Sequence, residues 1–216
     1  MDYCAVVVAA GKSERFKSSV NKLLYRLPNG IPVIDNALKL FREDKDCKQI
    51  VVVTNNDTIT YLANNRACGK ESYCQGGSSR SESVFNGLMA VMYDKVLVHD
   101  GARCYLLKED LEKLKQTLQT ENGAILVRDE TDTVKKVENG YIVSTIDREC
   151  LKRALTPQGF NTDDLLAAYK KAFKNDFRPT DEASVMEKYG DIKIKCVNSQ
   201  GHNNKITTLE DIKEIN

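Results

Sequence analysis

The chain has 216 residues, of which 41% are hydrophobic, and this suits one globular domain with a substantial core. Its 32 basic and 31 acidic residues nearly cancel, so no overall field attracts it to nucleic acid or to an acidic membrane surface. The seven cysteines are scattered and never spaced as C-x-x-C, which argues against a disulfide framework or a zinc site and predicts a reducing, cytoplasmic environment. No signal peptide precedes the first apolar run, and no run approaches the roughly 18 residues that a membrane span requires.

Short β-branched runs alternate with segments of helical periodicity along the first part of the chain. The expected strands are continuously apolar, as is typical of strands buried on both faces. They are residues 3–9, 49–54, 95–99 and 123–127, and the expected helices between them are residues 33–41, 58–68, 80–92 and 108–118. This alternation predicts a single α/β domain over residues 1–216, with a Rossmann-like, doubly wound, mostly parallel sheet.

The segment TVKKVENGYIVST, residues 133–145, breaks this rhythm with two strand-like halves. Its centre, Asn139-Gly140, is the pair that a type I′ hairpin turn favours. An isolated two-stranded ribbon is marginally stable, so Val134, Tyr141 or Val143 must bury against something. We therefore expect a projecting hairpin arm at about residues 131–150. The equivalent arm of a second chain is the simplest partner, and packing back on its own domain is the alternative.

The first expected strand ends in Ala9-Ala10-Gly11, and cations including Arg15 and Lys22 follow it. Ligands of a doubly wound sheet bind beyond the carboxyl ends of its strands, so this loop lies at the expected site. Small residues let backbone N–H groups approach an anion, which the cations would then surround. The loop matches neither the Walker A pattern nor G-x-G-x-x-G, and Thr54-Asn55 stands where a dinucleotide fold expects an acidic residue. An ordinary turn with solvated lysines is the alternative.

Two further loops fall at the same expected edge of the sheet. The stretch QGGSSRSESVFNGL places Gly76-Gly77 ahead of Arg80 and Ser83 at a helix start, where backbone donors can meet a ligand. The stretch VLVHDGAR ends a buried strand in Asp100 and Arg103, residue types that bind metals or phosphates. The alternatives are a glycine-rich turn with a serine N-cap, and a capping aspartate beside an exposed arginine.

A fourth polar segment lies near the C-terminus. In NNKITTLED, Lys205 stands between a polar loop and a Thr208-x-x-Asp211 capping pattern. Each of the four segments is a weak signal alone, but together they indicate one anion site.

Seven blocks, in one order, carry a resemblance to a known family. They are AAGKSERF…NKLL, GGSSRSESVFNGL, VLVHDGAR, DTVKKV, DRECLKRALTPQGF, TDEASVMEKYG and NNKITTLEDI. Over almost its whole length the sequence resembles the 2-C-methyl-D-erythritol 4-phosphate cytidylyltransferases of the non-mevalonate isoprenoid pathway. The TDEAS and HDGAR forms resemble this branch more than the ribitol-5-phosphate cytidylyltransferases, which remain the alternative. Ser13 replaces the usual second loop glycine, Cys104 replaces a common proline, and RDETDTV is longer than in the family.

The resemblance implies a role for each matching residue. Four cations are catalytic, and of these the last two also hold the acceptor phosphate: Arg15, Lys22, Arg148 and Lys205. The residues that it assigns to the nucleotide are Ala9, Ala10, Gly11, Ser13, Gly76, Arg80 and Ser83. The residues that it assigns to the acceptor are Asp100, Arg103, Thr133 and Thr156. A Mg²⁺ ion bridging the triphosphate is also implied, with Asp100 as its nearest protein group.

The implied reaction is attack of an acceptor phosphate oxygen on the α-phosphorus of CTP, with release of pyrophosphate. The nucleophile is already an anion and needs no general base, which fits a chain with only two histidines. Such a site must supply alignment and positive charge. A nucleotide-binding regulator without catalysis is the remote alternative, and the presence of both Arg15 and Lys22 argues against it. The resemblance also implies a homodimer in which Thr133 and Arg148 of one arm complete the neighbour's site.

Overall fold

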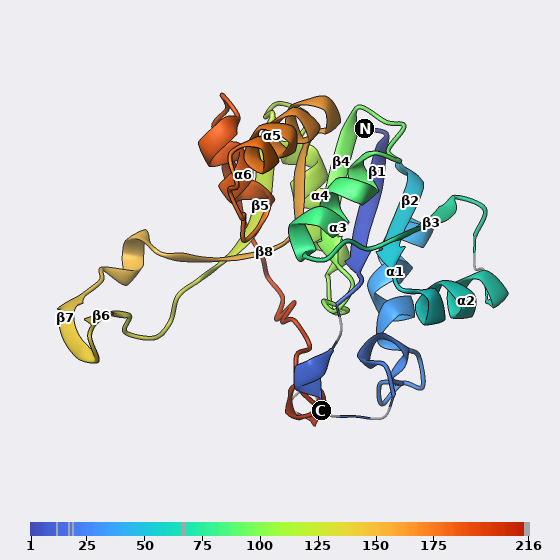
Figure 1. The fold of residues 1–216 in the computed structure, drawn as a ribbon, viewed down its shortest axis with the longest axis horizontal. Coiled ribbons are helices and arrows are strands. Elements are labelled where there is room, and N and C mark those ends of the chain that lie inside the picture. Colours follow the sequence, from blue (N-terminus) through green and yellow to red (C-terminus); the bar gives the residue numbers. More distant parts are fainter. Residues whose placement is uncertain (12, 17, 19, 66–67, 214–216) are drawn as a thin grey trace.

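Seven strands form one sheet in the order β3-β2-β1-β4-β8-β5-β9 (Figure 1). The structure is a computed structural model and describes residues 1–11, 13–16, 18, 20–65 and 68–213. The strands of this sheet are β1 (Tyr3–Ala9), β2 (Cys47–Thr54), β3 (Glu71–Gln75), β4 (Lys95–Asp100), β5 (Gly123–Asp129), β8 (Lys152–Asn161) and β9 (Lys195–Asn198). The helices are α1 (Val33–Glu43), α2 (Asn56–Asn64), α3 (Arg80–Leu88), α4 (Lys108–Thr117), α5 (Thr162–Lys174), α6 (Glu182–Tyr189) and α7 (Glu210–Lys213).

The sheet is mostly parallel, as the alternation of strands and helices predicts. β1 pairs in parallel with β2 and β4, β2 with β3, and β5 with β9. Only β8, among the described strands of this sheet, runs antiparallel to its neighbours, β4 and β5. The fold class is therefore confirmed as α/β with a Rossmann-like, mostly parallel sheet.

Side chains that alternate along β1 divide the core into two layers. Ala5 and Val7 belong to the cluster that α1, α2 and α4 cover, whereas Cys4 and Val6 belong to the cluster of α3, α5 and α6. Successive side chains of a strand point to opposite faces, so a strand between two helix layers must be apolar at every position. This is why the first strand is a continuous apolar run.

Three strands of the sheet lie outside the runs that the sequence analysis identified. β3, β8 and β9 contain polar residues or, in β8, Pro157 and Gly159, which obscure the strand pattern. The expected helix over residues 80–92 ends at Leu88, and that over residues 58–68 is α2, which ends at Asn64. Residues 66–67, within that second expectation, lie outside the described residues.

The expected hairpin is present as β6 (Lys135–Glu138) and β7 (Tyr141–Thr145). Asn139 and Gly140 have φ angles of 50° and 84°, the two positive values that a type I′ turn requires. Figure 1 shows the hairpin well away from the sheet rather than packed back on its own domain. Its exposed apolar side chains are Val137, Tyr141, Ile142 and Val143.

Two expectations from the sequence concern membrane-spanning helices and disulfides. Within the part of the chain that the structure describes, no helix is long and apolar enough to cross a membrane. No disulfide joins the cysteines of the described residues, and Cys4, Cys47 and Cys104 are buried in the core.

Candidate active site

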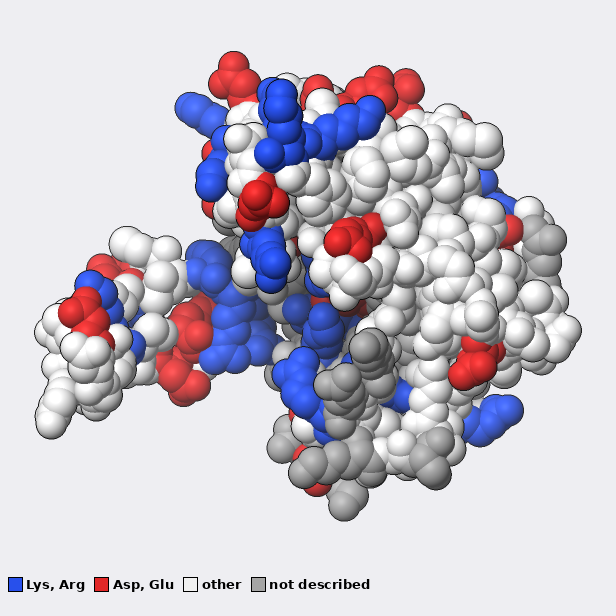
Figure 2. Space-filling model, in the orientation of Figure 1, with Lys and Arg blue, Asp and Glu red and all other residues white. Residues whose placement is uncertain are grey.

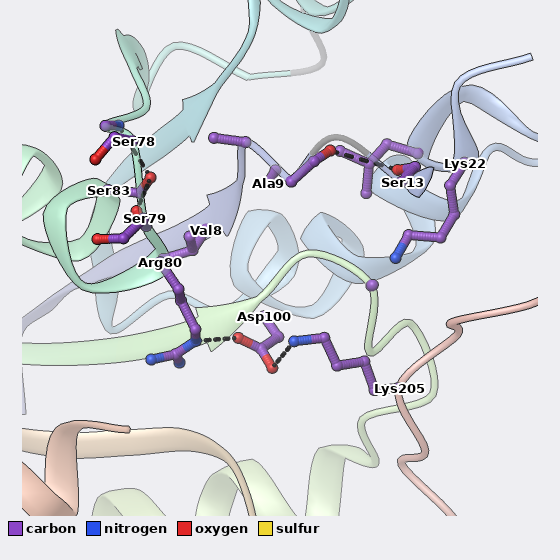
Figure 3. A pocket seen from close by; sticks show the side chains of 15 residues that line it. Val8, Ala9, Ser13, Lys22, Ser78, Ser79, Arg80, Ser83, Asp100 and Lys205 are labelled. Atoms are coloured by element: carbon purple, nitrogen blue, oxygen red, sulfur yellow. Dashed lines mark hydrogen bonds and ion pairs between the residues drawn. The ribbon is translucent and has the colours of Figure 1, made fainter. Parts of the chain in front are cut away.

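A cavity of about 450 Å³ opens beyond the carboxyl ends of β1 and β4 (Figure 3). The loop after β1 forms one wall, and the loop that leads into α3 forms the other. The lining residues are Val8, Ala9, Ala10, Gly11, Ser13, Lys22, Leu23, Gly77, Ser78, Ser79, Arg80, Ser83, Asp100, Ala102 and Lys205. The carboxyl edge of the sheet is thus the site, as the topology of doubly wound sheets predicts.

The loop after β1 is anchored by two apolar side chains. Phe16 and Leu23 are buried in the core, and the Phe16 ring packs edge-on against Tyr25 at 5.5 Å between centroids. Ser13 has a φ angle of 56°, the left-handed conformation that favours glycine. This angle accounts for the glycine that the family usually has there. The sequence has two further cations in this stretch, Lys12 and Lys17, which lie outside the described residues.

The loop before α3 is held by its own side chains. The Ser79 hydroxyl caps the helix by accepting from the Glu82 N–H, and the Glu82 carboxylate accepts from the Ser78 N–H and hydroxyl. A serine N-cap is therefore present. The same loop also packs against the loop after β1, where Gly76 lies beside Ala10. A Cβ at Gly76 would lie 2.1 Å from the Cβ of Ala10, so only glycine fits there.

Asp100, at the end of β4, lies between cations from three parts of the chain. Its carboxylate accepts from Arg80 Nε at 3.1 Å and from Lys205 Nζ at 3.0 Å, and Arg103 Nε is 3.5 Å away (Figure 3). Burial alone would raise the pKa of Asp100, but the three cations outweigh it and hold that pKa well below its usual range. Asp100 is therefore a carboxylate that orders cations, and Arg103, mostly buried, is not the exposed arginine of the alternative.

Lys22 reaches the cavity from the side of the loop after β1, opposite Arg80 (Figure 3). Its Nζ donates to the backbone carbonyl of Ile206 at 3.0 Å. Burial, and then the nearby charges of Lys205 and Arg15, lower the pKa of Lys22 below its ordinary value. The carboxylates of Asp100 and Asp211 act in the opposite direction but do not offset this lowering. A multiply charged anion would therefore stabilise the site further.

A second cavity, of about 280 Å³, shares Arg80, Asp100 and Lys205 with the first. Its other lining residues are Arg103, Ala154, Leu155, Thr156, Gln158, Thr180 and Asp181. Arg103 donates through Nη1 to the Asn203 carbonyl, whereas its buried Nε makes no hydrogen bond within the described part of the chain. Arg80, Asp100 and Lys205 thus separate the two cavities, and each cavity has basic groups that could bind a phosphate.

The comparisons with known proteins decide the family. The profile of the 2-C-methyl-D-erythritol 4-phosphate cytidylyltransferase family matches residues 3–215. The chain belongs to this family. A cytidylyltransferase of that name from Bacillus mycoides is 36% identical over 215 residues, covering 97% of this chain and 94% of its own. One from Shouchella clausii is 39% identical over 217 residues, covering 98% and 94%.

Solved structures of cytidylyltransferases have the same fold. The 4-diphosphocytidyl-2C-methyl-D-erythritol synthase of Anaerococcus prevotii matches with a TM-score of 0.86 and 28% identity, covering 99% of this chain and 95% of its own. The 2-C-methyl-D-erythritol 4-phosphate cytidylyltransferase of Francisella tularensis matches with a TM-score of 0.84 and 28% identity, covering 100% and 98%. The chain is therefore an enzyme of the cytidylyltransferase class with their architecture.

Most of the residues that sequence reasoning selected for this cytidylyltransferase meet at the two cavities. Nine line the first: Ala9, Ala10, Gly11, Ser13, Lys22, Arg80, Ser83, Asp100 and Lys205. Arg103 and Thr156 line the second, and Gly76 lies behind the first, against Ala10 and Ser83. Arg15 is exposed and lies outside the lining of either cavity.

Thr156 and His99 form an internal chain of hydrogen bonds. The Arg103 carbonyl can only accept, so His99 Nε2 carries the proton and Nδ1 accepts from the Thr156 hydroxyl at 3.0 Å. That hydroxyl in turn accepts from the Asp100 N–H at 3.1 Å. In this arrangement the Thr156 hydroxyl proton points to His99, while the hydroxyl oxygen holds the backbone N–H of Asp100.

Thr133 and Arg148 lie on the arm, away from both cavities of their own chain. Arg148 donates to the Thr131 carbonyl at 2.8 Å, and both predicted site residues are exposed. Figure 2 shows Lys and Arg side chains gathered where the arm leaves the body, and Asp and Glu side chains on the adjoining part of the arm. The cytidylyltransferase chain does not bring these two residues to its own site.

Sequence reasoning missed several residues of the site. Gly77, Ser78 and Ser79 follow the selected Gly76, and the quoted glycine-rich block could have identified them. Thr180, Asp181 and Glu182 belong to the TDEAS block, whose Asp181 and Ser184 form a capping box at the start of α6. The capping pattern indicates a helix start. The ion pair between Glu182 and Arg80, at 2.8 Å, depends on tertiary structure and could not be read from the sequence.

Proposed function

We propose that this cytidylyltransferase joins CTP and 2-C-methyl-D-erythritol 4-phosphate, with the nucleotide in the larger cavity and the acceptor in the smaller one. The observation that carries the assignment is the shared wall of Arg80, Asp100 and Lys205 between the two spaces. Two substrates that must react at one phosphorus atom need adjacent sites with a common boundary. The names of the relatives support the choice of acceptor.

The reaction breaks one phosphorus–oxygen bond and forms another. An oxygen of the acceptor phosphate attacks the α-phosphorus of CTP, and the bridging oxygen leaves with pyrophosphate. The nucleophile carries its own negative charge, so the site needs no group to remove a proton. Its demands are alignment of the two substrates and compensation of charge around the α-phosphorus.

Cations from separate segments supply that compensation. Lys22 and Lys205 line the larger cavity, and Arg15 stands close enough to Lys22 to lower its pKa. An incoming triphosphate offers Lys22 a stronger partner than the Ile206 carbonyl, to which it now donates. Lys205 is held toward the boundary between the substrates by Asp100. These residues bind and orient phosphate oxygens; they transfer no proton.

A magnesium ion fits this donor set only as an ion carried by the nucleotide. The described residues contain no cluster of three or more carboxylate, histidine or cysteine side chains that could hold a metal. Asp100 is the carboxylate that faces both cavities, and it would be the protein ligand. Mg²⁺ commonly binds through one or two carboxylates together with substrate phosphates and water. When bound, it would neutralise charge on the triphosphate.

The arm supports a homodimeric arrangement. Tyr141 is 79% exposed and Ile142 is 68% exposed, which leaves the hairpin without the apolar partner that a two-stranded ribbon needs. A two-fold axis would place the same ribbon of a second chain against it. Arg148 and Thr133 would then face the partner's cavities, where their donors could contact the acceptor phosphate.

Pyrophosphate release tests the proposed function. The wild-type protein with CTP, Mg²⁺ and 2-C-methyl-D-erythritol 4-phosphate is expected to release pyrophosphate in proportion to the cytidylyl product. Omitting the acceptor should abolish the release. Release that needs no acceptor, or no release at all, would contradict the proposal.

A further inference from the structure

Glu182 is a fully buried carboxylate outside the lining of either cavity. It is the first residue of α6, a position where the helix dipole favours a negative charge. Asp181 and Ser184 fix this helix start with a reciprocal capping box. Gln158 of β8 ties the same turn to the sheet, because it donates to Asp181 and accepts from the Ala183 N–H. The backbone that presents Glu182 is therefore rigid.

The Glu182 side chain holds Arg80 in a two-pronged ion pair. Arg80 Nη1 donates to Oε1 at 2.8 Å and Nη2 donates to Oε2 at 3.2 Å. The Tyr169 hydroxyl also donates to Oε1, at 3.1 Å. Burial would lower the pKa of Arg80, but the charges of Glu182 and Asp100 raise it instead, so the guanidinium remains charged.

Arg80 passes this constraint to the site. Its Nε donates to Asp100 at 3.1 Å, so three of the five guanidinium N–H groups are used within the protein. The side chain is 26% exposed and lines both cavities. Figure 3 shows the guanidinium beside Asp100, with Lys205 on the other side of that carboxylate. The remaining donors of Arg80 therefore point in directions that Glu182 determines.

We propose that Glu182 is a positioning residue of the nucleotide site, which acts through Arg80 and so fixes the place of Asp100. The inference rests on the proposed function of the two cavities. With Glu182 present, Arg80 has two carboxylate partners and leaves one oxygen of Asp100 to Lys205. Without the Glu182 charge, Arg80 would have Asp100 as its carboxylate partner and would compete with Lys205 for it. The side chains that separate the two substrates would then change position.

Glu182→Gln tests this proposal because it removes the charge and keeps the size of the side chain. We expect kcat/KM for CTP to fall at least tenfold, mainly through a higher KM, in a protein that remains folded. Tyr169→Phe is the matched control: it removes the other hydrogen bond to Glu182 without touching Arg80, and we expect kcat/KM within twofold of wild type. A folded Glu182→Gln protein whose kcat/KM is within twofold of wild type would overturn the proposal.

A double-variant cycle separates positioning from simple structural support. If Glu182 acts through Arg80, adding Glu182→Gln to Arg80→Ala should reduce kcat/KM by less than threefold beyond Arg80→Ala alone. The double variant should also melt at a higher temperature than Arg80→Ala, because that variant leaves a buried carboxylate without its cation. Losses that multiply would show that Glu182 acts independently of Arg80 and would overturn the proposal.

If Glu182→Gln does not fold, Glu182→Asp replaces it. Aspartate keeps the charge but withdraws it by one methylene, so we expect KM for CTP to rise at least threefold while Tyr169→Phe stays near wild type. An unchanged KM would overturn the inference. Failure of the proposed function is distinct, because the wild-type protein itself would then lack activity with CTP and the acceptor.

Discussion

Lys22 shows how a single residue's environment bears on the chemistry. Its ammonium lies with Lys205 and Arg15 nearby, and its pKa is lowered by burial and by their charges. Bringing cations together costs folding free energy that an anionic ligand recovers, so the cluster is more consistent with binding than with structure. The surrounding core is formed by Phe16 and Leu23, and Lys22 is not needed for it.

Lys22→Ala is expected to lower kcat by about a hundredfold or more, because loss of one such charge-stabilising contact costs about 2.7–4 kcal/mol in the transition state. Arg15→Ala is expected to have an effect of the same order. Lys39→Ala, at an exposed position of α1, is the control and should leave kcat unchanged. Steady-state pyrophosphate release measures all three variants. Near-normal turnover in a folded Lys22→Ala protein would remove Lys22 from the catalytic role.

His99 makes stability depend on pH. Burial lowers its pKa to about 4, against about 6.5 in the unfolded chain, so the folded protein holds the neutral ring. Its stabilising effect is complete above pH about 6.5 and is lost as the pH falls toward 4, because the unfolded chain binds the proton first. From pH 7.5 to 5.0 the free energy of unfolding should fall by about 2 kcal/mol in urea titrations.

His99→Gln is the control for that slope. The variant lacks the titrating ring, so its free energy of unfolding should fall less than half as much over the same pH interval. Equal falls in the two proteins would show that other groups cause the dependence on pH.

At the scale of elements, the sequence predicted the strands and turns whose residue pattern follows from a single physical requirement. The continuous apolar run of β1 predicted a strand covered on both faces, and Asn139-Gly140 predicted the turn between β6 and β7. β8 was missed because Pro157 and Gly159 weaken its strand pattern, although neighbouring strands stabilise it from both sides.

The residues of the candidate site likewise fall into those that the sequence could predict and those that it could not. Residues such as Gly76 and Asp100 could be predicted because their residue types, placed at strand or helix ends, suit a ligand. The roles of Glu182 and His99 could not, because they depend on which side chains the fold brings into contact. The distances between Asp100 and its three cations likewise depend on residues up to 105 positions apart.

The junction between the two loops of the larger cavity gives a prediction at this scale. Gly76→Ala would place its Cβ 2.1 Å from the Cβ of Ala10, and overpacking of this kind costs about 1–3 kcal/mol. Gly11→Ala is a matched control, because its Cβ would meet no heavy atom of the described residues within 4 Å. Urea unfolding should show the loss for Gly76→Ala and a change within about 0.5 kcal/mol for Gly11→Ala. Equal stability of the two variants would contradict the close contact.

At the scale of the whole molecule, the proposed homodimer would divide the active site between two chains. Lys22 lies at the cavity of its own body, whereas Arg148 lies on the arm that extends away from it. In the proposed homodimer, each site combines the body of one chain with the arm of the other.

Subunit mixing tests this arrangement. A Lys22→Ala chain and an Arg148→Ala chain are each expected to be nearly inactive as homodimers. After exchange, one site of the heterodimer receives both defects and the other receives neither, so about a quarter of wild-type activity should return at equal mixing. Verified heterodimers that stay as inactive as their parents would mean that each site is built from a single chain.

Competition between acceptors tests the central claim, that this cytidylyltransferase uses 2-C-methyl-D-erythritol 4-phosphate. One reaction contains the wild-type protein, CTP, Mg²⁺ and equal concentrations of that acceptor and ribitol 5-phosphate, and mass spectrometry separates the two cytidylyl products. We predict that 4-diphosphocytidyl-2-C-methyl-D-erythritol forms in large excess, at a rate equal to the release of pyrophosphate. An excess of the ribitol product, or the absence of both products, would contradict the account.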